Sequence, residues 1–573
     1  MVVLGEVQLC GKIDLNKEEY LIKKMGDEQS MNSKKIAITT IFASLFLLLT
    51  ACGKQTSSTQ KQVLNLSTTA PLSTIDISKS TGYGQTGNVF ESFYRLGKNG
   101  STTAGLAKSS SVSKDGKTWT FKIRKAYWSN GDRITAQDFV YSWRRTINPK
   151  TKSPYSYLFN GIKNANAIIA GKKSANQIGI SATDKQTVVI KLDKAISYFK
   201  VLMAYPLFGP QNQKVVEKYG SKYGTRSQYM VYSGPFTIKS WNGTGNKWKF
   251  VKNTHYWDKS VVKLHQINYT VVENPTTGHE LYQQNKLDLT PLSNQQVKNY
   301  RSSSQFKSYP YSFISYLAYN FNDKDTDKRK ALNNRYIRLA MSLAINRQVL
   351  TKKVLGDGSY IPTGFVASGL AKDPKTGEDF SKQQTVKNTV TYNEKLAKEY
   401  WKKGLQETGL KSLKLTLLSS NDDSSSSVVS QYLQSQYAKV LPGLSITIRS
   451  IPSNNASQSA KDGDFDLYLS GWGGDFNDPI TFLQIPLTGT SYNYGGYSNS
   501  QYDALIEKAQ NEDANNTNKR WNDLVAAAKI FNADQGVTPI YQQVTSYLQK
   551  SDVKGIIHNT AGTQWNYKYT YIK

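Results

Sequence analysis

The residues best suited to bind a metal or to act as nucleophiles are few in this 573-residue chain. Its four histidines show no metal-ligand spacing: His255, His265, His279 and His558. Asp462, Asp464 and Asp466 alternate like the start of a calcium loop, but Leu467 and Gly473 stand where that loop needs its glycine and glutamate. We therefore expect no metal site, and we interpret the three aspartates as alternate residues of a strand.

Two short motifs match acyl-serine enzymes by letter, namely Ser111-Val-Ser-Lys114 and Lys375-Thr-Gly377. In those enzymes the serine opens a buried helix and the Lys-Thr-Gly triplet lies on a strand beside it. Here both motifs fall in polar stretches next to turns, and the chain has no Gly-x-Ser-x-Gly elbow or phosphate-binding glycine loop. We expect no catalytic site and no cofactor. An acyl-serine enzyme is kept as the alternative from a different functional class.

Aromatic side chains are abundant, with 37 Tyr, 10 Trp and 20 Phe, or 12% of the chain. Tyrosine and tryptophan combine a rigid apolar surface with a polar group, which suits recognition of varied ligands. Part of this set must form ordinary core. The composition therefore favours a binding function only weakly.

The formal charge of +31 raises the question of nucleic-acid binding. The lysines are scattered among Ser, Asn and Thr, with no basic run of five and no recognition motif, so we expect no nucleic-acid partner. The length suggests about three domains with an ample core. There is one uninterrupted apolar run, which excludes a multi-span membrane protein.

That apolar run covers residues 36–49 and follows Lys34 and Lys35. It is too short to span a bilayer, and a basic flank before a short apolar core is typical of a secretory signal peptide. Residues 1–30 fit no targeting pattern, whereas Met31 begins as a signal peptide should. We expect a leader of residues 1–51, with translation starting at Met31 and the signal peptide at 31–51.

The run ends in Leu49-Thr-Ala-Cys52, which resembles the lipobox of bacterial lipoproteins. In those proteins the cysteine carries a diacylglyceryl group, and two acyl chains give stable membrane attachment. We expect Cys52 to be lipidated and residues 52–62 to form a flexible tether in a Gram-positive bacterium. The alternative is an inert, buried cysteine. Cys10 would leave with the leader, so no disulfide would form.

The folded body alternates short strands and amphipathic helices, which predicts an α/β fold. Residues 119–124 predict a strand, and Thr135 with Asp138 forms a capping box that starts a helix. Residues 335–350 predict one buried helix capped by Asn333 or Asn334. Further strands are predicted at 413–418, 444–448 and 465–469, a helix at 428–440, and loops at 370–378 and 419–427.

Several long segments resemble the signature of extracellular family 5 solute-binding proteins, most closely the members that serve oligopeptide ABC importers. The segments lie at 115–124, 128–143, 149–155, 233–236, 253–257 and 334–340, and the similarity covers nearly all of 63–573. The resemblance implies a two-lobed, periplasmic-binding-protein-like fold (type II, three-domain, cluster C) with a ligand cleft between the lobes. Domain I would take 63–95, 218–318 and 541–573, domain II 96–217, and domain III 319–540.

In the family, an aspartate of a ligand-binding loop pairs with the peptide α-ammonium, and the segment Gly471 to Pro479 matches that loop. The resemblance assigns this role to Asp475 and places Trp472 against the ligand, between Gly471 and Gly473. The alternatives are a capping aspartate and a core tryptophan. Approximate alignment adds two weaker candidates, Tyr157 and Tyr83.

Two positions depart from the family pattern. Gly82 stands where Gram-negative members place an acidic residue near the ligand, and Leu469 stands where they have an arginine. Both departures concern how the C-terminus of the peptide is recognised.

The resemblance implies a monomeric receptor, anchored by lipid on the extracellular face of the cell membrane, that passes oligopeptides to the transmembrane subunits of an ABC permease. A receptor for a signalling peptide, or for another small solute such as a dipeptide, nickel or a sugar, is the alternative among binding proteins. The scarcity of histidine argues against nickel.

Overall fold

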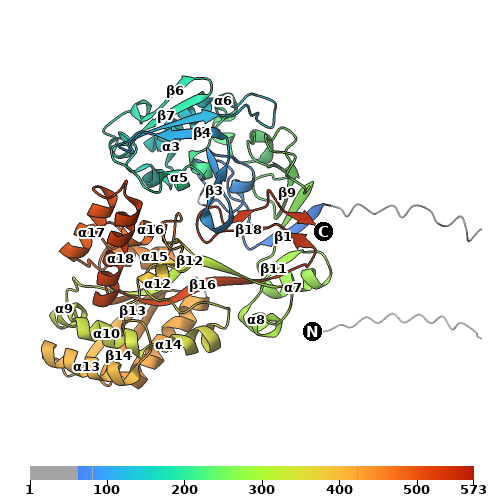
Figure 1. The fold of residues 1–573 in the computed structure, drawn as a ribbon. Coiled ribbons are helices and arrows are strands. Elements are labelled where there is room, and N and C mark those ends of the chain that lie inside the picture. Colours follow the sequence, from blue (N-terminus) through green and yellow to red (C-terminus); the bar gives the residue numbers. More distant parts are fainter. Residues whose placement is uncertain (1–61, 81, 423) are drawn as a thin grey trace, which may run out of the picture. The chain divides into compact units, whose positions relative to one another are not determined.

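The computed structural model describes residues 62–80, 82–422 and 424–573 (Figure 1). The predicted start at Met31, the signal peptide and Cys52 lie outside these residues. Within the described ranges, no helix has the length and apolar character needed to cross a membrane.

A ten-stranded mixed sheet is the largest element of the described chain. Two long antiparallel strands, β12 (Phe306–Tyr319) and β16 (Val537–Gln549), lie side by side in its middle (Figure 1). Three strands continue the sheet beyond β12, in the order β15 (Leu467–Gly473), β13 (Leu413–Ser420) and β14 (Leu444–Ile451). Five continue it beyond β16, in the order β11 (Leu289–Pro291), β1 (Val63–Thr68), β10 (Gln266–Val271), β9 (Lys247–Lys252) and β8 (Phe236–Lys239).

The pairing of β12 with β16 is interrupted in its middle. The register shifts between Pro310 and Ile314, and again between Ser315 and Tyr316. A proline has no N–H to contribute to a ladder, so a local break is expected there. The side chain of Gln542 fills the irregular stretch by donating to the carbonyls of Tyr311 at 3.2 Å and Ser368 at 2.9 Å.

A separate four-stranded antiparallel sheet lies at the top of Figure 1. Its strands are, in order, β4 (Ala107–Val112), β5 (Thr118–Ile123), β7 (Thr187–Lys191) and β6 (Ile180–Asp184). Helix α3 (Ala136–Ile147) packs against β6 and β7 and begins with the predicted capping box, in which the Thr135 amide donates to Asp138 at 2.7 Å. The strand predicted at 119–124 is β5, and the helix predicted after Thr135 is α3, so both predictions are confirmed.

The prediction of one helix over 335–350 is correct at its start but wrong at its end. Helix α10 (Arg335–Ala344) begins at the cap Asn334 but ends before Asn346, which caps a second short helix. The buried guanidinium of Arg347 donates to the carbonyls of Ser342 at 2.9 Å and Pro539 at 2.8 Å. These contacts replace continued α-helical bonding, and the chain goes on as a π-helix over Leu350–Leu355.

Three further expectations need correction. The predicted strand at 465–469 is β15, which starts later and runs to Gly473. Asp462, Asp464 and Asp466 are not alternate strand residues, because they lie in the turn between helix α15 (Ser453–Lys461) and β15. Most of the loop predicted at 419–427 is regular structure, since β13 runs to Ser420 and helix α14 (Ser424–Val440) follows.

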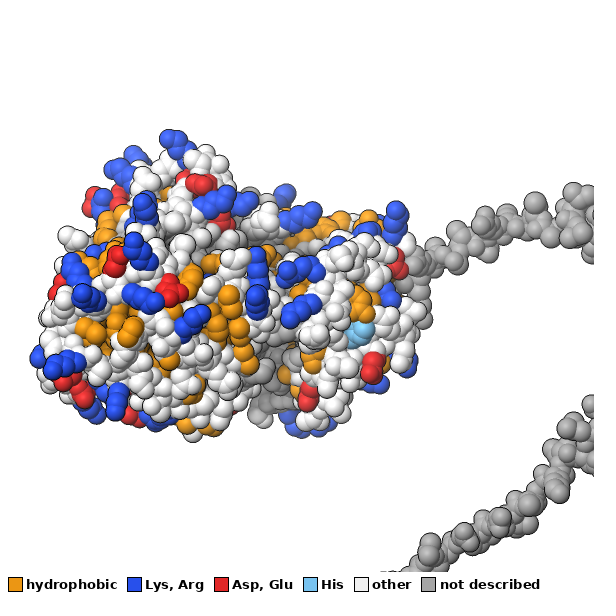
Figure 2. Space-filling model, turned by 90° about the horizontal axis from the view of Figure 1, so that it is seen from below, with side chains coloured by type: hydrophobic (Ala, Val, Ile, Leu, Met, Phe, Trp, Pro, Cys, Tyr) orange, Lys and Arg blue, Asp and Glu red, His pale blue; other side chains and the backbone are white. Residues whose placement is uncertain are grey.

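Charged side chains are dispersed on the face seen from below. Figure 2 shows Lys and Arg spread over this face among uncharged side chains, without one dominant basic patch. This agrees with the scattered spacing of lysines in the sequence.

Candidate functional site

The end of β15 carries the predicted binding segment. Strand β15 pairs with β12 along its whole length, from Leu467 to Gly473, but its pairing with β13 stops at Leu418 opposite Tyr468. Beyond Tyr468, the edge of β15 that faces away from β12 has no strand partner among the described residues. An open strand edge offers backbone N–H and C=O groups to an added chain.

Glycines on this strand leave room for two aromatic rings of β12. A Cβ on Gly471 would lie 2.0 Å from the Phe313 ring, and one on Gly473 would lie 2.8 Å from the Tyr311 hydroxyl. The two rings stack with centroids 6.1 Å apart. Any larger residue at Gly471 would displace Phe313, so the glycine there is required by packing.

Asp475 follows directly, in the loop after β15. Its amide donates to the Thr481 hydroxyl at 2.9 Å, and Trp472 donates from its indole to the Thr481 carbonyl at 2.8 Å. The start of a short helix, α16 (Ile480–Leu483), therefore fixes both predicted residues at once. Trp472 is half-buried, with one side against Tyr492 at a centroid distance of 5.1 Å.

The Asp475 carboxylate is only partly satisfied. Its Oδ1 accepts a hydrogen bond from the Tyr157 hydroxyl at 3.0 Å, but its Oδ2 is shielded from solvent and accepts no hydrogen bond from any described residue. Burial raises the pKa of Asp475 to about 6, and the Tyr157 hydrogen bond opposes this rise. A buried carboxylate oxygen without a donor is costly, so a ligand that donates to it would relieve the cost.

Four tyrosines surround this carboxylate. The Tyr205 hydroxyl donates to the Asp475 carbonyl, and Tyr83 packs against Tyr205 and Tyr155 at centroid distances of 5.5 and 5.1 Å. The buried Tyr83 hydroxyl has no hydrogen-bond partner among the described residues. A cavity of about 200 Å³ opens here, lined by Asp475, Tyr83, Tyr155 and other residues that include Gly82.

A second cavity of about 550 Å³ continues along β15. Its wall contains the strand residues Tyr468, Leu469, Ser470, Gly471 and Trp472, whereas the first cavity contains Gly473, Gly474 and Asp475. The two cavities thus follow one another along the same strand. We call them together the β15 trench.

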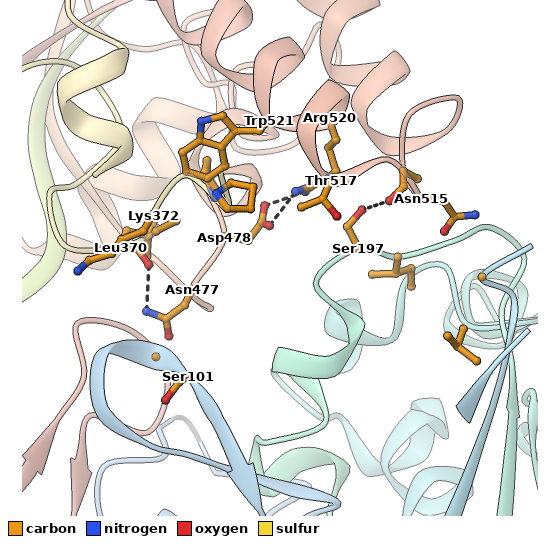
Figure 3. Close-up of a pocket in the computed structure, with 18 of the residues that line it drawn as sticks. Ser101, Ser197, Leu370, Lys372, Asn477, Asp478, Asn515, Thr517, Arg520 and Trp521 are labelled. Carbon is orange, nitrogen blue, oxygen red and sulfur yellow. Dashed lines mark hydrogen bonds and ion pairs between the residues drawn. The ribbon is translucent and has the colours of Figure 1, made fainter. Parts of the chain in front are cut away.

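A third cavity, of about 630 Å³, is lined by the far part of the same loop. Figure 3 shows Asp478 facing Arg520, with carboxylate to guanidinium distances of 2.7 and 2.8 Å, and Asn477 donating to the Leu370 carbonyl at 3.2 Å. On the opposite wall, the Ser197 hydroxyl donates to the Ala514 carbonyl. The loop after β15 therefore contributes to a cavity on each of its two halves.

The six predicted ligand residues lie together. Gly471 and Trp472 line the second cavity of the trench, Tyr83, Gly473 and Asp475 line the first, and Tyr157 donates to Asp475. Tyr155, Tyr205 and Tyr311 were missed, although Tyr155 lies two residues before Tyr157. The serine-enzyme motifs are not assembled. Ser111 is exposed on β4, and Lys375 lies in an exposed turn held by Asp373. The described residues contain no cluster of three or more potential metal ligands.

Comparison with known proteins agrees with this geometry. The family model for bacterial extracellular solute-binding proteins, family 5, matches residues 102–494. A dipeptide-binding protein of Lactococcus lactis subsp. cremoris is 38% identical over 551 residues, covering 94% of this chain and all of the relative. The oligopeptide-binding protein OppA of Bacillus subtilis is 30% identical over 565 residues, again covering 94% of this chain and all of the relative.

Solved structures give the same likeness. The structure of Listeria monocytogenes OppA bound to peptide superimposes with a TM-score of 0.73 and is 36% identical. The match covers 90% of this chain and the whole of that chain.

Proposed function

Because this chain belongs to the bacterial extracellular solute-binding proteins of family 5, we propose that it is a receptor that captures oligopeptides outside the cell and delivers them to an ABC import permease. The family consists of binding proteins rather than enzymes, so the acyl-serine alternative is abandoned. The likeness to peptide-bound OppA also confirms the predicted two-lobed α/β fold class.

The unpaired Oδ2 of Asp475 is the observation that carries this proposal. A peptide α-ammonium has three donors and a positive charge, so it can satisfy Oδ2 and neutralise the buried carboxylate together. The open edge of β15 runs from Leu469 to Gly473, ends two residues before Asp475, and can pair with the peptide backbone whatever its sequence. Gly471 keeps the strand close to Phe313 and leaves Trp472 as the first side chain a ligand meets.

Closure around the ligand would involve few protein contacts. Tyr157, Lys194, Ser197 and Tyr205 come from residues 96–217, and each bonds to a residue of 319–540. The ring of Tyr198 also stacks on that of Phe476 at a centroid distance of 4.5 Å. Hydrogen bonds of this kind can be exchanged for water when the segments separate, so the ligand would supply much of the closing energy and release would follow reopening.

The predicted domain division is kept as part of the proposal. It is supported by the sheets, because the four-stranded sheet falls within 96–217 and β13, β14 and β15 fall within 319–540. Strands β1, β8, β9, β10 and β11 fall within the segments assigned to domain I.

Calorimetric titration with peptides of two to eight residues, in several unrelated sequences at each length, tests the receptor function and separates the alternatives. An oligopeptide receptor should bind several unrelated sequences of four or more residues. A preference for dipeptides would favour the function named for the Lactococcus relative, and binding of one sequence alone would indicate a signalling receptor. Binding of no peptide would refute the proposal.

We also propose that Cys52 carries a lipid that anchors the receptor to the extracellular face of the membrane. The lipobox-like segment before Cys52 supports this. Metabolic labelling with an alkyne analogue of palmitate should label the wild type and the C10S control, but not C52S, which should appear in the culture medium. Equal labelling of C52S would refute the anchor.

A further inference from the structure

The charge of the β15 trench is opposite to that of the chain as a whole. Although the protein has 73 Lys and Arg residues, none of them is among the described residues that line either cavity of the trench. The charged residues that do line it are two acids, Asp475 in the first cavity and Asp422 in the second. The excess of basic residues in the chain is therefore not found on the described surface of the trench.

The rest of the second cavity is neutral but polar. Its wall is formed largely by hydroxyl side chains, from seven serines and five tyrosines. Hydroxyl groups can hydrogen-bond a ligand directly or through water, and because they are uncharged they do not select the charge of the ligand. Among the described residues, Asp422 is consequently the one charged side chain of this wall.

The topology places Asp422 beside the open edge of β15. Strands β13 and β15 run parallel, with Leu417 opposite Leu467 and Leu418 opposite Tyr468. If the same register is carried on, Asp422 stands level with Trp472, three residues before Asp475. At about 3.3 Å per residue, the two carboxylates are separated by roughly 10 Å along the strand direction. An extended peptide with its N-terminus at Asp475 would pass Asp422 after about three residues.

Hydrogen bonds hold Asp422 in place and favour its ionised form. The amide of Ser453 donates to its Oδ2 at 2.8 Å, and its own amide donates to the Ser420 hydroxyl at 3.1 Å. Hydrogen bonds from Ser453 hold the pKa of Asp422 below its ordinary value. The residue is exposed to the cavity, so its charge is available to a ligand.

We propose that the β15 trench selects cationic peptides, with the α-ammonium at Asp475, a Lys or Arg side chain at Asp422, and the C-terminal carboxylate unpaired. The proposal rests on the peptide-binding function above and names the class of peptide. A carboxylate inside this trench would meet two acids and no cation, which is unfavourable. The buried side chain of Leu469, which lines the second cavity, also has no hydrogen-bond donor to offer to a peptide carboxylate.

The test uses tetra-alanine peptides in which the second, third or fourth residue is lysine or its uncharged analogue norleucine, each with a free or an amidated C-terminus. Calorimetry measures each peptide with the whole mature protein, with D422N, and with D327N. Asp327 is an exposed aspartate of helix α9 (Thr326–Asn333) outside the trench, so D327N removes the same charge from elsewhere.

We expect lysine at one position to bind about fivefold more tightly than norleucine, and this preference to vanish in D422N but persist in D327N. Amidation should leave the dissociation constant unchanged or lower it. Equal binding of lysine and norleucine peptides at every position, or tenfold tighter binding of the free acids, would overturn the charge selection while leaving a peptide receptor. If none of the peptides bound, the receptor function itself would fail.

Discussion

Two aspartates of one loop, the half-buried Asp475 and the buried Asp478, have opposite surroundings. Both oxygens of Asp478 are bound by the Arg520 guanidinium, at 2.7 and 2.8 Å. Asp475 has one hydroxyl donor, from Tyr157, and its second oxygen has no donor in the described chain. Only two residues separate them, so the contrast cannot come from a general property of the loop.

The difference distinguishes a structural carboxylate from a binding one. A buried charge with a bidentate partner is complete within the protein, and removal of that partner destabilises the fold. A buried charge with an unused oxygen is incomplete, and a ligand can complete it. Substitutions at the two positions should therefore separate stability from binding.

The largest effect is expected from breaking the Asp478 pair. Arg520→Met keeps the bulk of the side chain but leaves Asp478 buried without a counter-charge, which should lower the free energy of unfolding by about 3 to 5 kcal/mol. Urea denaturation followed by circular dichroism measures this. The double variant R520M/D478N should recover much of the loss because no buried charge is left. No loss in R520M would contradict the structural role of the pair.

Asp475→Asn should affect binding instead. The amide keeps the shape but removes the charge that the α-ammonium needs, so peptides with free N-termini should bind about 100-fold more weakly. N-acetylated peptides, which have no ammonium, should bind nearly equally to both proteins. Calorimetry with matched acetylated and free peptides measures this, and an equal loss for both kinds would show that Asp475 does not bind the N-terminus.

Protonation of Asp475 should also weaken the binding of peptides with free N-termini, but less than the D475N substitution does. With a pKa of about 6 in the empty protein, most Asp475 is neutral at pH 5, so affinity for a free N-terminus should fall about tenfold between pH 7 and pH 5. D475N should show no such fall. A flat profile for the wild type would contradict the ionic role.

The same raised pKa predicts a stability trend. Because the folded value lies above the ordinary value near 4, the folded state binds more protons between about pH 4 and pH 6, and burial of the charged form costs stability above pH 6. D475N should therefore melt at a higher temperature than the wild type at pH 7, and the two should converge near pH 4. Scanning calorimetry at the two pH values measures this.

The smallest effect is expected from Tyr157→Phe, which removes the one side-chain donor to Asp475. Loss of a hydrogen bond to a charged group, partly exposed here, should weaken peptides with free N-termini only three- to tenfold, since the ammonium still supplies donors. The pKa of empty Asp475 should rise, so the pH profile of binding should shift to higher pH. A profile unchanged in position would contradict the contact.

Local patterns predicted a good part of this fold. The alternation at 119–124 and the capping box at Thr135 predicted β5 and α3 because both signals act over a few residues. The break after α10 could not be predicted in this way. It depends on Arg347 reaching the carbonyl of Pro539, nearly 200 residues away along the chain.

The site was predicted in part for the same reason. The segment Gly471 to Pro479 is continuous, so its resemblance to a binding loop located Asp475 and Trp472. Tyr205 and Tyr311 come from distant segments, and only the folded chain brings them to that loop. Asp422 was assigned to a surface loop, because a serine-rich stretch gives no sign that it follows a strand parallel to β15.

The offset between β12 and β16 bears on how the two halves of the large sheet can move. These strands join β15 on one side to β11 on the other, and their ladder is out of step at two neighbouring places, between Pro310 and Ile314 and between Ser315 and Tyr316. A rotation concentrated there would break few hydrogen bonds, since few are formed. The pairs at either end, at Phe306 and at Ala318, would stay intact. The register shifts in the ladder would thus act as a hinge, about which the loop with Asp475 moves as a rigid body together with β15.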